Sequence, residues 1–570
     1  MKTNNTPRSG TPDSQGHQAT LALIQLNRFG DIIQTAQAVE ELKKTHPNYR
    51  VVLVARSQFA KPLEGILGKY FDHVYSIDAK KILFSSETTG LKNTLGEFNA
   101  FLSQLNGEKV DVLINLSFSK TSSYLASLIP STHKIGLYQD LTNRMVINDK
   151  WSQVLYSTVM RGALNPFSLV DLFRNIIGIK PSSSPRKKLA LATLKSNTIV
   201  VHPFASHERK AWKNEKWVEV IYRVLKENDG AMVQIVGAKN EVLRSQIICE
   251  NPLLKTQSHR IQNLTGKTSF VELLEHLKRS RLFVGHDSMV GHLASLADTP
   301  TLTVSLGSVR PFETTPYHDK AYNLSPRTKC FPCFPSDACS FTQCHLDIPY
   351  QVVSSCVKQL FEHKELSSEW ARTNISNFHA SSIHLQRAQF SKGQLQLEHL
   401  LDSSADTNEV FRSLYRVAWS FVVGDSDENL PIPKISTGAH KELLDSLVGL
   451  QHLFELSEFG KKYSRFILEE ISSQMPSIAK IKDYSKKIDE IDHLQSLVYK
   501  TSPQLSPIVD YFAIRKANLY GDNVVKMTES SYYAFEECAH LCSIMYELIE
   551  KTISEHKLTI GKSTRPETNK

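Results

Sequence analysis

The chain has 570 residues, of which 41% are hydrophobic and 22% are charged, and its formal net charge is +9. This length is too great for a single hydrophobic core, so we expect about two to four domains. The composition is typical of globular proteins, and no apolar run approaches the roughly 18 residues that a membrane-spanning helix needs. The mild positive charge suits an anionic substrate or a membrane surface, and it does not single out nucleic acid as a partner.

The first part of the chain predicts an α/β domain over residues 20–180. Residues 1–19 are polar and lack the apolar segment of a secretory signal, so we expect a disordered lead-in and a cytoplasmic protein. An apolar strand pattern at 20–26 is followed by a polar turn at 27–31. Further patterns indicate a helix and two strands, at 32–44, 51–55 and 109–116. Alternating strands and helices predict a parallel sheet, whose ligands bind beyond the carboxyl ends of its strands.

A second α/β domain is predicted over residues 189–362. It follows a segment rich in Pro, Ser and basic residues at 181–188, which we interpret as a linker. Its apolar strand patterns are at 198–202, 231–236, 281–284 and 301–305. Two doubly wound halves of this kind would form a cleft between them, and we expect the chemistry there.

The remainder, residues 367–560, predicts a helical domain. Gly and Pro become rare, and long amphipathic patterns dominate at 409–423, 441–475, 480–499 and 530–556. No catalytic signature is present, and we find no convincing internal repeat. We expect this domain to serve docking, oligomerisation or presentation of an acceptor.

Residues 284–316 are the most informative stretch, because they read as strand, turn, helix and strand. Asp287 or Ser288 is expected to cap the helix, Gly291 lies in its first turn, and His292 follows. The first backbone N–H groups of a helix have no partner within it, so such an end suits a phosphate. A capped βαβ unit without a ligand is the alternative.

Three further side chains follow predicted strands, and each has two interpretations. Asp31 is either a helix cap or a general base that takes a proton from an attacking hydroxyl. Lys210 belongs either to a solvated basic loop or to a diphosphate site, for which a compact positive charge is suited. Glu241 either accepts hydrogen bonds from ribose hydroxyls or is an exposed carboxylate near a helix start.

Four of the eight cysteines form the pattern C-x2-C-x5-C-x4-C, namely Cys330, Cys333, Cys339 and Cys344. Four thiols at this density suit a tetrahedral zinc or iron ion. We therefore predict a structural metal site, and free structural cysteines are the alternative. We expect no catalytic cofactor.

Taken together, these blocks resemble the ADP-heptose:lipopolysaccharide heptosyltransferase family, glycosyltransferase family nine. Residues 26–35, LNRFGDIIQT, resemble its opening R-x-G-D segment, and 287–293, DSMVGHL, resemble its D-T-G-x-G-H-L signature. His202-Pro203 with Lys210-Ala-Trp212 resembles its H-P-G…K-x-W block. The resemblance covers roughly residues 20–358. Phe204 stands where the family usually has glycine, and Ser288-Met289 replaces Thr-Gly.

The resemblance implies a GT-B fold of two Rossmann-like halves and an inverting, metal-independent transfer from ADP-heptose. It implies that Asp31 is the base, that Lys210 holds the diphosphate and that Glu241 contacts the nucleoside. It also implies that Asp287, Ser288, Gly291 and His292 bind the sugar diphosphate. The expected acceptor is lipopolysaccharide core or, given the helical domain, a protein hydroxyl. A degenerate scaffold and a UDP-sugar enzyme are the alternatives, and we expect peripheral membrane contact and oligomerisation through the helices.

Overall fold

The structure is a computed structural model. It describes residues 18–78, 90–160, 164–180, 196–334, 337–401, 405–424, 435–519 and 521–563. The predicted linker at 181–188 and all but the end of the predicted lead-in at 1–19 lie outside the described residues.

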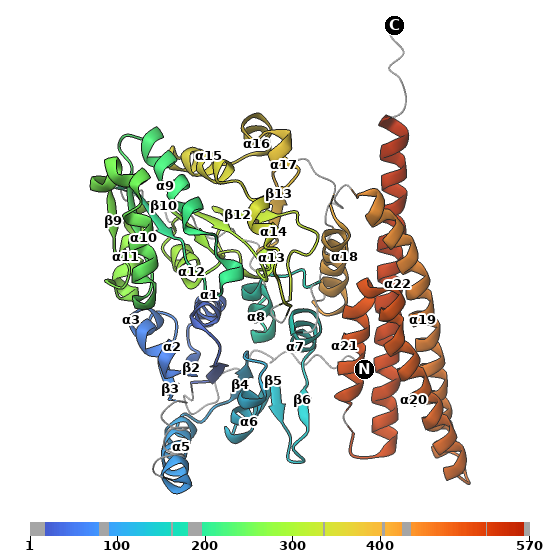
Figure 1. The fold of residues 1–570 in the computed structure, drawn as a ribbon. Helices are drawn as coiled ribbons and strands as arrows, with labels where there is room; N and C mark the ends of the chain where they lie inside the picture. The colour runs from blue at the N-terminus through green and yellow to red at the C-terminus, as the bar shows by residue number, and fades with distance from the viewer. Residues whose placement is uncertain are drawn as a thin grey trace. The chain divides into compact units, whose positions relative to one another are not determined.

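The first sheet has six strands within the described residues, in the order β3-β2-β1-β4-β5-β6 (Figure 1). They are β1 (Thr20–Gln25), β2 (Arg50–Arg56), β3 (His73–Ile77), β4 (Val112–Asn115), β5 (His133–Gln139) and β6 (Met145–Ile147). Strands β1 to β4 pair in parallel, and β6 is antiparallel to β5. The central strand β1 is buried on both faces, which explains its continuous apolar run.

The helices of this half begin with α1 (Phe29–Thr45), which follows β1 and buries the predicted apolar face at Ile32, Ile33 and Val39. The others are α2 (Ser57–Ala60), η1 (Lys61–Leu63), α3 (Glu64–Leu67), α5 (Leu91–Asn106), α6 (Lys120–Leu128), α7 (Lys150–Leu155), η2 (Tyr156–Met160) and α8 (Leu169–Ile177). Together with the parallel strands they form the predicted α/β half.

The second sheet has eight strands within the described residues, in the order β14-β13-β12-β11-β10-β7-β8-β9. Its parallel strands are β7 (Ser196–His202), β8 (Met232–Ile235), β9 (Ile261–Asn263), β10 (Ser280–His286), β11 (Thr301–Val304) and β12 (Ala321–Pro326). Two antiparallel strands, β13 (Ile383–Ser391) and β14 (Gln394–His399), extend it beyond β12.

The helices of the second half alternate with its parallel strands or follow them in the chain (Figure 1). They are η3 (Glu208–Lys210), α9 (Asn214–Glu227), η4 (Lys239–Glu241), α10 (Val242–Cys249), η5 (Pro252–Arg260), α11 (Phe270–Arg279), α12 (Met289–Leu296), α13 (Pro311–Thr314), α14 (Gln343–Asp347), α15 (Tyr350–Phe361), α16 (Ser368–Asn374) and α17 (Asn377–Ala380). Helices α9 and α15 pack together over a core that includes Trp217 and Val353. In each half, the first six strands have the Rossmann order 3-2-1-4-5-6, so the predicted fold class is confirmed.

Residues 383–399 differ from the expectation, because they fall within the range predicted to be helical and form strands β13 and β14. Ile383 and Leu385 of β13 are fully buried, and His384 and Gln386, which alternate with them, are also buried. The strand is therefore covered on both faces, and it continues the second sheet before the long helices begin.

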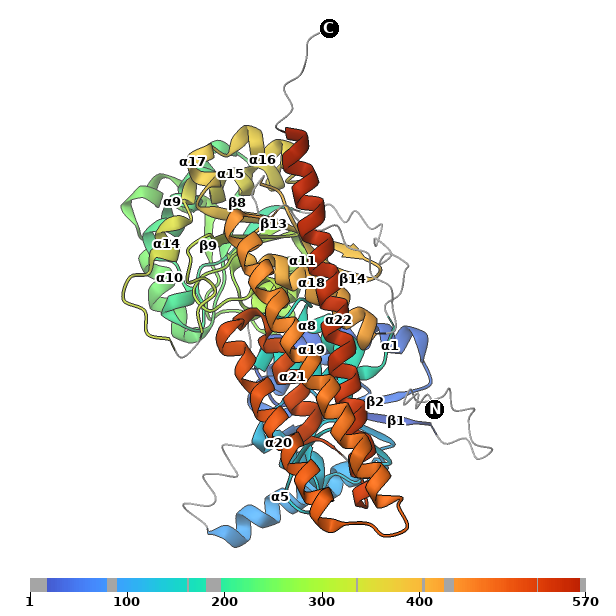
Figure 2. The same ribbon diagram turned by 90° about the vertical axis from the view of Figure 1, so that its right-hand side faces the viewer.

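The long helices are α18 (Thr407–Val422), α19 (Thr437–Ile471), α20 (Ile478–Thr501), α21 (Ser506–Ala517) and α22 (Val524–Ser563), with η6 (Pro503–Leu505) between α20 and α21. Helix α19 packs against both α20 and α22, and Figure 2 shows them running side by side. A methyl group at Gly460 would lie 2.4 Å from the ring of Phe535, so only glycine permits this approach of α19 to α22. None of the helices among the described residues combines the length and apolar character that a membrane crossing requires.

The chain divides into two compact units that cut across the predicted domain boundaries. Unit 1 comprises residues 1–117, 125–134 and 167–403, and unit 2 comprises residues 118–124, 135–166 and 404–570. Within unit 2, Lys150 of α7 pairs with Glu537 of α22 at 2.7 Å. The amide oxygen of Asn518 also accepts a hydrogen bond from the N–H of Ile147 in β6, at 2.7 Å. The helices of unit 2 therefore fold together with a piece of the first α/β half.

Candidate functional site

The candidate residues follow the strands that flank the switch point of each sheet. In the first sheet β1 lies between β2 and β4, and in the second sheet β7 lies between β8 and β10. Asp31 comes after β1, Lys210 after β7 and Asp287 directly after β10. The carboxyl ends of strands at such a reversal are the usual place for ligands in doubly wound sheets. All the candidate residues belong to unit 1.

The two halves of unit 1 meet where helix α1 contacts helix α12. A methyl group at Gly30 would lie 3.3 Å from Cδ2 of His292, so these two positions are already in close contact. Two turns further along α1, Nε2 of Gln37 donates a buried hydrogen bond of 2.9 Å to Oγ of Ser295 in α12. The start of α1, which carries Asp31, is thus held beside the start of α12.

Asp31 caps its own helix. Its Oδ2 accepts a hydrogen bond of 3.2 Å from the backbone N–H of Arg28, which is the capping interpretation of the sequence. Burial raises the pKa of Asp31 above its ordinary value; the N–H and the charge of Arg28 act against this, and the nearby charge of Asp287 adds to it. A carboxylate with a raised pKa is a stronger base, so the capping contact and a role as general base are compatible.

Lys210 and Asp287 form an ion pair between the two central strand ends of the second sheet. Nζ of Lys210 lies 3.7 Å from Oδ2 of Asp287, and their side chains are 25% and 14% exposed. A partly exposed ammonium group at this place can still be reached by an anion. The neighbouring basic residues do not share the position: Arg209 donates to the carbonyl oxygen of Asp337, and Lys213 is exposed at the start of α9.

The start of α12 differs from the expected capped helix. Ser288 is its N-cap residue, but the side chain of Ser288 accepts no hydrogen bond from the helix. Among the described residues, the buried atoms Oγ of Ser288 and Nδ1 of His292 have no hydrogen-bond partner. Burial lowers the pKa of His292, although the charge of Asp287 opposes this, so the ring is neutral. Buried polar groups are normally paired, and such an end can accept a ligand.

Gly291 has a packing role in the structure. A methyl group there would lie 3.3 Å from Cγ of Pro316. Its backbone N–H donates to the carbonyl oxygen of Ser288 at 3.1 Å, so this N–H is already engaged within the chain. The predicted donor-binding role of Gly291 stays a prediction.

Glu241 lies at the start of α10 and faces the end of β7. Its Oε2 accepts the N–H of Ala238 at 2.7 Å and lies 3.8 Å from Nε2 of His202. Burial acts to raise the pKa of Glu241, but His202, the Ala238 N–H and the charge of Arg244 together lower it. The carboxylate is therefore ionised and able to accept hydrogen bonds. Sequence reasoning quoted His202 as part of a motif but gave it no role.

Phe204, the departure from the family pattern, fills the space beneath Gly237. The Phe204 ring is fully buried and packs edge-on against His202. A methyl group at Gly237 would lie 2.9 Å from this ring and 2.8 Å from Oε2 of Glu241. The guanidinium of Arg244 lies over the same ring, 5.2 Å from its centroid. Phe204 thus supports the residues around Glu241.

His286 is a buried residue of the site that sequence reasoning missed. It ends strand β10, directly before Asp287, and is fully buried. Its Nε2 accepts hydrogen bonds from the backbone N–H of Trp212 and the indole N–H of Trp217, at 2.9 Å and 3.1 Å. The available signal was a histidine next to the acidic residue of the signature, together with a tryptophan two residues after Lys210.

The four cysteines predicted to bind a metal lie near one another. Burial raises the pKa of Cys344, the backbone at Gly307 opposes this, and the other three thiols of the cluster add to it. Among the described residues, which include all four, no three of these sulfurs lie within 4.8 Å of one another. Sulfurs that share a zinc ion at about 2.3 Å would be about 3.8 Å apart. The metal site on the cysteine cluster therefore stays a prediction.

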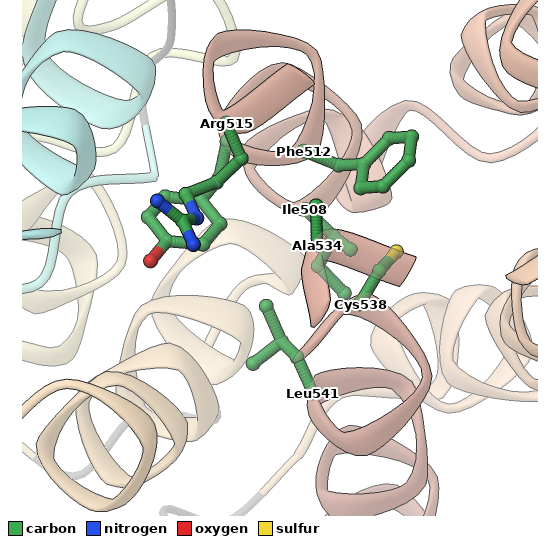
Figure 3. Close-up of a pocket in the computed structure, with 7 residues that line it drawn as sticks. Ile508, Phe512, Arg515, Ala534, Cys538 and Leu541 are labelled. Atoms are coloured by element: carbon green, nitrogen blue, oxygen red, sulfur yellow. The ribbon is translucent and has the colours of Figure 1, made fainter. Parts of the chain in front are cut away.

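A separate pocket with about 170 Å³ of empty space lies in unit 2, between α21 and α22 (Figure 3). It is lined by Ile508, Tyr511, Phe512, Arg515, Ala534, Cys538 and Leu541. Its polar groups are engaged, because Tyr511 and Arg515 both bind the carboxylate of Glu537 at 3.1 Å. The pocket is apolar packing space, and none of the candidate site residues lines it.

Comparison with known proteins identifies relatives for the α/β part of the chain. Residues 98–345 match the model of glycosyltransferase family 9 (heptosyltransferase). Lipopolysaccharide heptosyltransferase 3 of Escherichia coli is 23% identical over 289 residues, which are 48% of this chain and 80% of that protein. Lipopolysaccharide core heptosyltransferase OpsX of Haemophilus influenzae is 22% identical over 316 residues, which are 53% of this chain and 82% of that protein. A glycosyltransferase family 9 structure from Veillonella parvula is similar over 61% of this chain and 98% of its own, with 17% identity and a TM-score of 0.45.

The range matched by the family model contains most of the candidate site. Lys210, Glu241, Asp287 and His292 lie within residues 98–345, as do the four cysteines. Asp31 lies before this range, and the long helices from α18 onward lie after it.

Proposed function

This chain contains a glycosyltransferase family 9 domain, and from that premise we propose that it transfers a heptose from a nucleoside diphosphate to a hydroxyl acceptor. The relatives from E. coli and H. influenzae are named as lipopolysaccharide heptosyltransferases, which supports lipopolysaccharide core as the acceptor. The sequence resemblance supports ADP-heptose as the donor. A protein hydroxyl, presented through the helices of unit 2, is the competing acceptor.

In the proposed reaction, Asp31 is the general base. Its carboxylate takes the proton of the acceptor hydroxyl as the hydroxyl oxygen forms a bond to the anomeric carbon. The bond from that carbon to the diphosphate breaks, and the diphosphate leaves with the electron pair. A single displacement inverts the configuration at the anomeric carbon. The raised pKa of Asp31, which burial causes, makes it a better base than an exposed aspartate.

The leaving diphosphate is proposed to be held by Lys210 and the start of α12. Negative charge grows on the diphosphate only as the bond breaks, so positive groups aimed at it stabilise the transition state more than the bound donor. Lys210 supplies a full charge, and α12 supplies the partial positive charge of a helix N-terminus. Ser288 and His292 supply the unpartnered polar atoms. The carboxylate of Glu241 is proposed to accept hydrogen bonds from the ribose hydroxyls.

The observation that carries this proposal is the contact between the starts of α1 and α12. Gly30 lies against the ring of His292, so the neighbouring Asp31 is beside a helix end whose polar groups lack partners. A base and an anion-binding end in this proximity are what a displacement at a sugar diphosphate requires.

Replacement of the base tests the proposal most directly. We expect Asp31→Asn to lower kcat about 10²–10⁴-fold, because general-base catalysis has that magnitude, and to leave ADP affinity unchanged in calorimetry. Asp72→Asn is the matched control, since Asp72 pairs with Lys43 and accepts the N–H of Val51 near the start of β2, at the opposite edge of the sheet. Near-normal turnover by the Asp31 variant would rule out Asp31 as the base.

A thermal-shift screen with ADP, UDP and GDP tests the donor class. A ligand present at 100 times its dissociation constant adds about 2.7 kcal/mol to stability, which is easily measured as a rise in Tm. We expect ADP to give the largest rise. A larger rise with UDP would favour the competing donor, and the absence of any rise would favour a scaffold that binds no nucleotide.

The proposed transfer uses no metal ion, because Lys210 and the start of α12 provide the positive charge. We therefore expect activity to persist in EDTA. Metal analysis of the purified protein and of Cys330→Ser tests the structural site separately: an equimolar zinc or iron content that falls in the variant would support it. A metal-free wild-type protein would contradict the predicted site.

A further inference from the structure

His286 joins the two strand ends that carry Lys210 and Asp287. It directly precedes Asp287 at the end of β10, and Trp212 is two residues beyond Lys210 in the connection that follows β7. The hydrogen bond from the Trp212 N–H to Nε2 of His286, at 2.9 Å, therefore runs beside the Lys210–Asp287 pair. No other backbone group of 211–213 donates to a side chain of β10 within the described residues.

The hydrogen bonds of His286 define its tautomer. Nδ1 lies 3.0 Å from the carbonyl oxygen of Val304, and a carbonyl can only accept, so Nδ1 carries the proton. Nε2 is then a pure acceptor, and it receives both the Trp212 N–H and the indole N–H of Trp217. Both tryptophan rings pack edge-on against the imidazole, with centroids 6.3 Å and 5.1 Å away.

The surroundings keep His286 neutral. Burial lowers the pKa of His286 to about 3; the Val304 carbonyl opposes this, and electrostatic interactions with His202, His345 and Arg244 add to it. Protonation at Nε2 would place a proton against two N–H donors. His286 therefore stays neutral, and Nε2 stays an acceptor, at all ordinary pH values.

We propose that His286 is a positioning residue. By accepting both tryptophan N–H groups, it holds the segment that contains Lys210 against the end of β10. Lys210 and Asp287 then lie together at the donor diphosphate. This inference rests on the proposed function, since it assigns Lys210 to the diphosphate. His286 itself touches neither the sugar nor the phosphates.

A double-mutant cycle on ADP affinity separates positioning from simple core stability. The cycle uses His286→Leu, Lys210→Ala and the double variant, and it measures ADP dissociation constants by calorimetry with melting temperatures alongside. We expect His286→Leu alone to weaken ADP binding about tenfold, a loss within the range of one neutral hydrogen bond. In the Lys210→Ala background, the same change should weaken ADP binding less than about twofold, because the group it positions is gone.

Two further variants complete the test. His286→Gln places an amide oxygen near the position of Nε2, so we expect it to recover part of the affinity, and it remains informative if the leucine variant does not fold. His318→Leu is the control, because His318 is a buried histidine that binds Asp298 and precedes β12, at the opposite edge of the sheet. It should lower the melting temperature and leave ADP affinity unchanged.

Two outcomes would overturn the inference in distinguishable ways. If the effects of His286→Leu and Lys210→Ala on ADP affinity multiply in the double variant, His286 stabilises the core without positioning Lys210, and the proposed function stands. If Lys210→Ala alone leaves ADP affinity unchanged, the diphosphate role of Lys210 fails, and the inference about His286 fails with it.

Discussion

The two helix starts that meet in unit 1 differ in how their first backbone groups are satisfied. At the start of α1, Oδ2 of Asp31 accepts the N–H of Arg28, so the chain provides its own cap. At the start of α12, Ser288 makes no capping hydrogen bond, and its Oγ and Nδ1 of His292 have no partner among the described residues. A helix start normally satisfies its polar groups within the protein.

Under the proposed function, the two helix starts have different roles. The self-capped start of α1 holds a carboxylate in one orientation, as a base requires. The uncapped start of α12 keeps its hydrogen-bonding groups available, as a binding site for an anion requires. A capped helix start is more stable, whereas an uncapped start leaves hydrogen-bonding groups for a ligand. The start of α1 is of the first kind, and the start of α12 is of the second.

Among three tests of this comparison, the largest expected effect is on ADP binding at the start of α12. We expect His292→Leu to weaken ADP binding about 10- to 150-fold, because a hydrogen bond to a charged group contributes about 1.5–3 kcal/mol. The variant should fold normally, since Nδ1 of His292 has no partner in the chain to lose. Calorimetry gives the affinity and a melting curve gives the control. Unchanged ADP affinity would break the comparison, because α12 would then be an ordinary uncapped helix.

The pH dependence of turnover reports on the start of α1. Burial raises the pKa of Asp31, and the base must be ionised, so kcat/KM should fall as the pH drops through a value above 3.8, the ordinary pKa of aspartate. The negative charge of Asp287 contributes to this raised pKa. Asp287→Asn should therefore lower the pKa of Asp31 and move the acid limb of the profile to lower pH. An acid limb that does not move would show that another group titrates.

The smallest expected effect is on stability, and it compares two serine N-caps. Ser269 caps α11, where its Oγ accepts the N–H of Glu272 at 3.3 Å, whereas Ser288 of α12 makes no such bond. We expect Ser269→Ala to cost about 1 kcal/mol in the free energy of unfolding and Ser288→Ala to cost less than about 0.5 kcal/mol. Denaturant titration measures both. Equal losses would mean that Ser288 does cap its helix in solution.

Much of the fold could be predicted, because the central strands are covered on both faces. Strands β1 and β10 are buried almost throughout, so their residues form apolar runs that are visible in the sequence. The hairpin of β13 and β14 was not predicted, because buried polar residues such as His384 and Gln386 conceal the strand pattern. Helix α21 was also missed, since its apolar residues do not follow one clear helical face.

The candidate site residues could be identified from the sequence, but the contacts and hydrogen bonds between them could not. Asp31 and His292 are far apart in the chain, and only packing of α1 on α12 brings them together. The partners of Nε2 of His286 are one backbone N–H and one indole N–H, about 70 residues earlier in the chain, and no spacing rule connects them. The cap expected at Ser288 did not form, because a capping residue type does not determine where its side chain points.

Unit 2 is built from separate segments of the chain, and this affects the design of chimaeras between this protein and its relatives. Residues 135–166 and the long helices share the Lys150–Glu537 ion pair and the Ile147–Asn518 hydrogen bond. A chimaera joined at residue 404 would separate these partners: Glu537 would keep Tyr511 and Arg515 but lose Lys150, and the backbone N–H of Ile147 would lose its acceptor. A chimaera that exchanges the long helices should therefore also exchange residues 135–166, so that both segments come from the same parent protein.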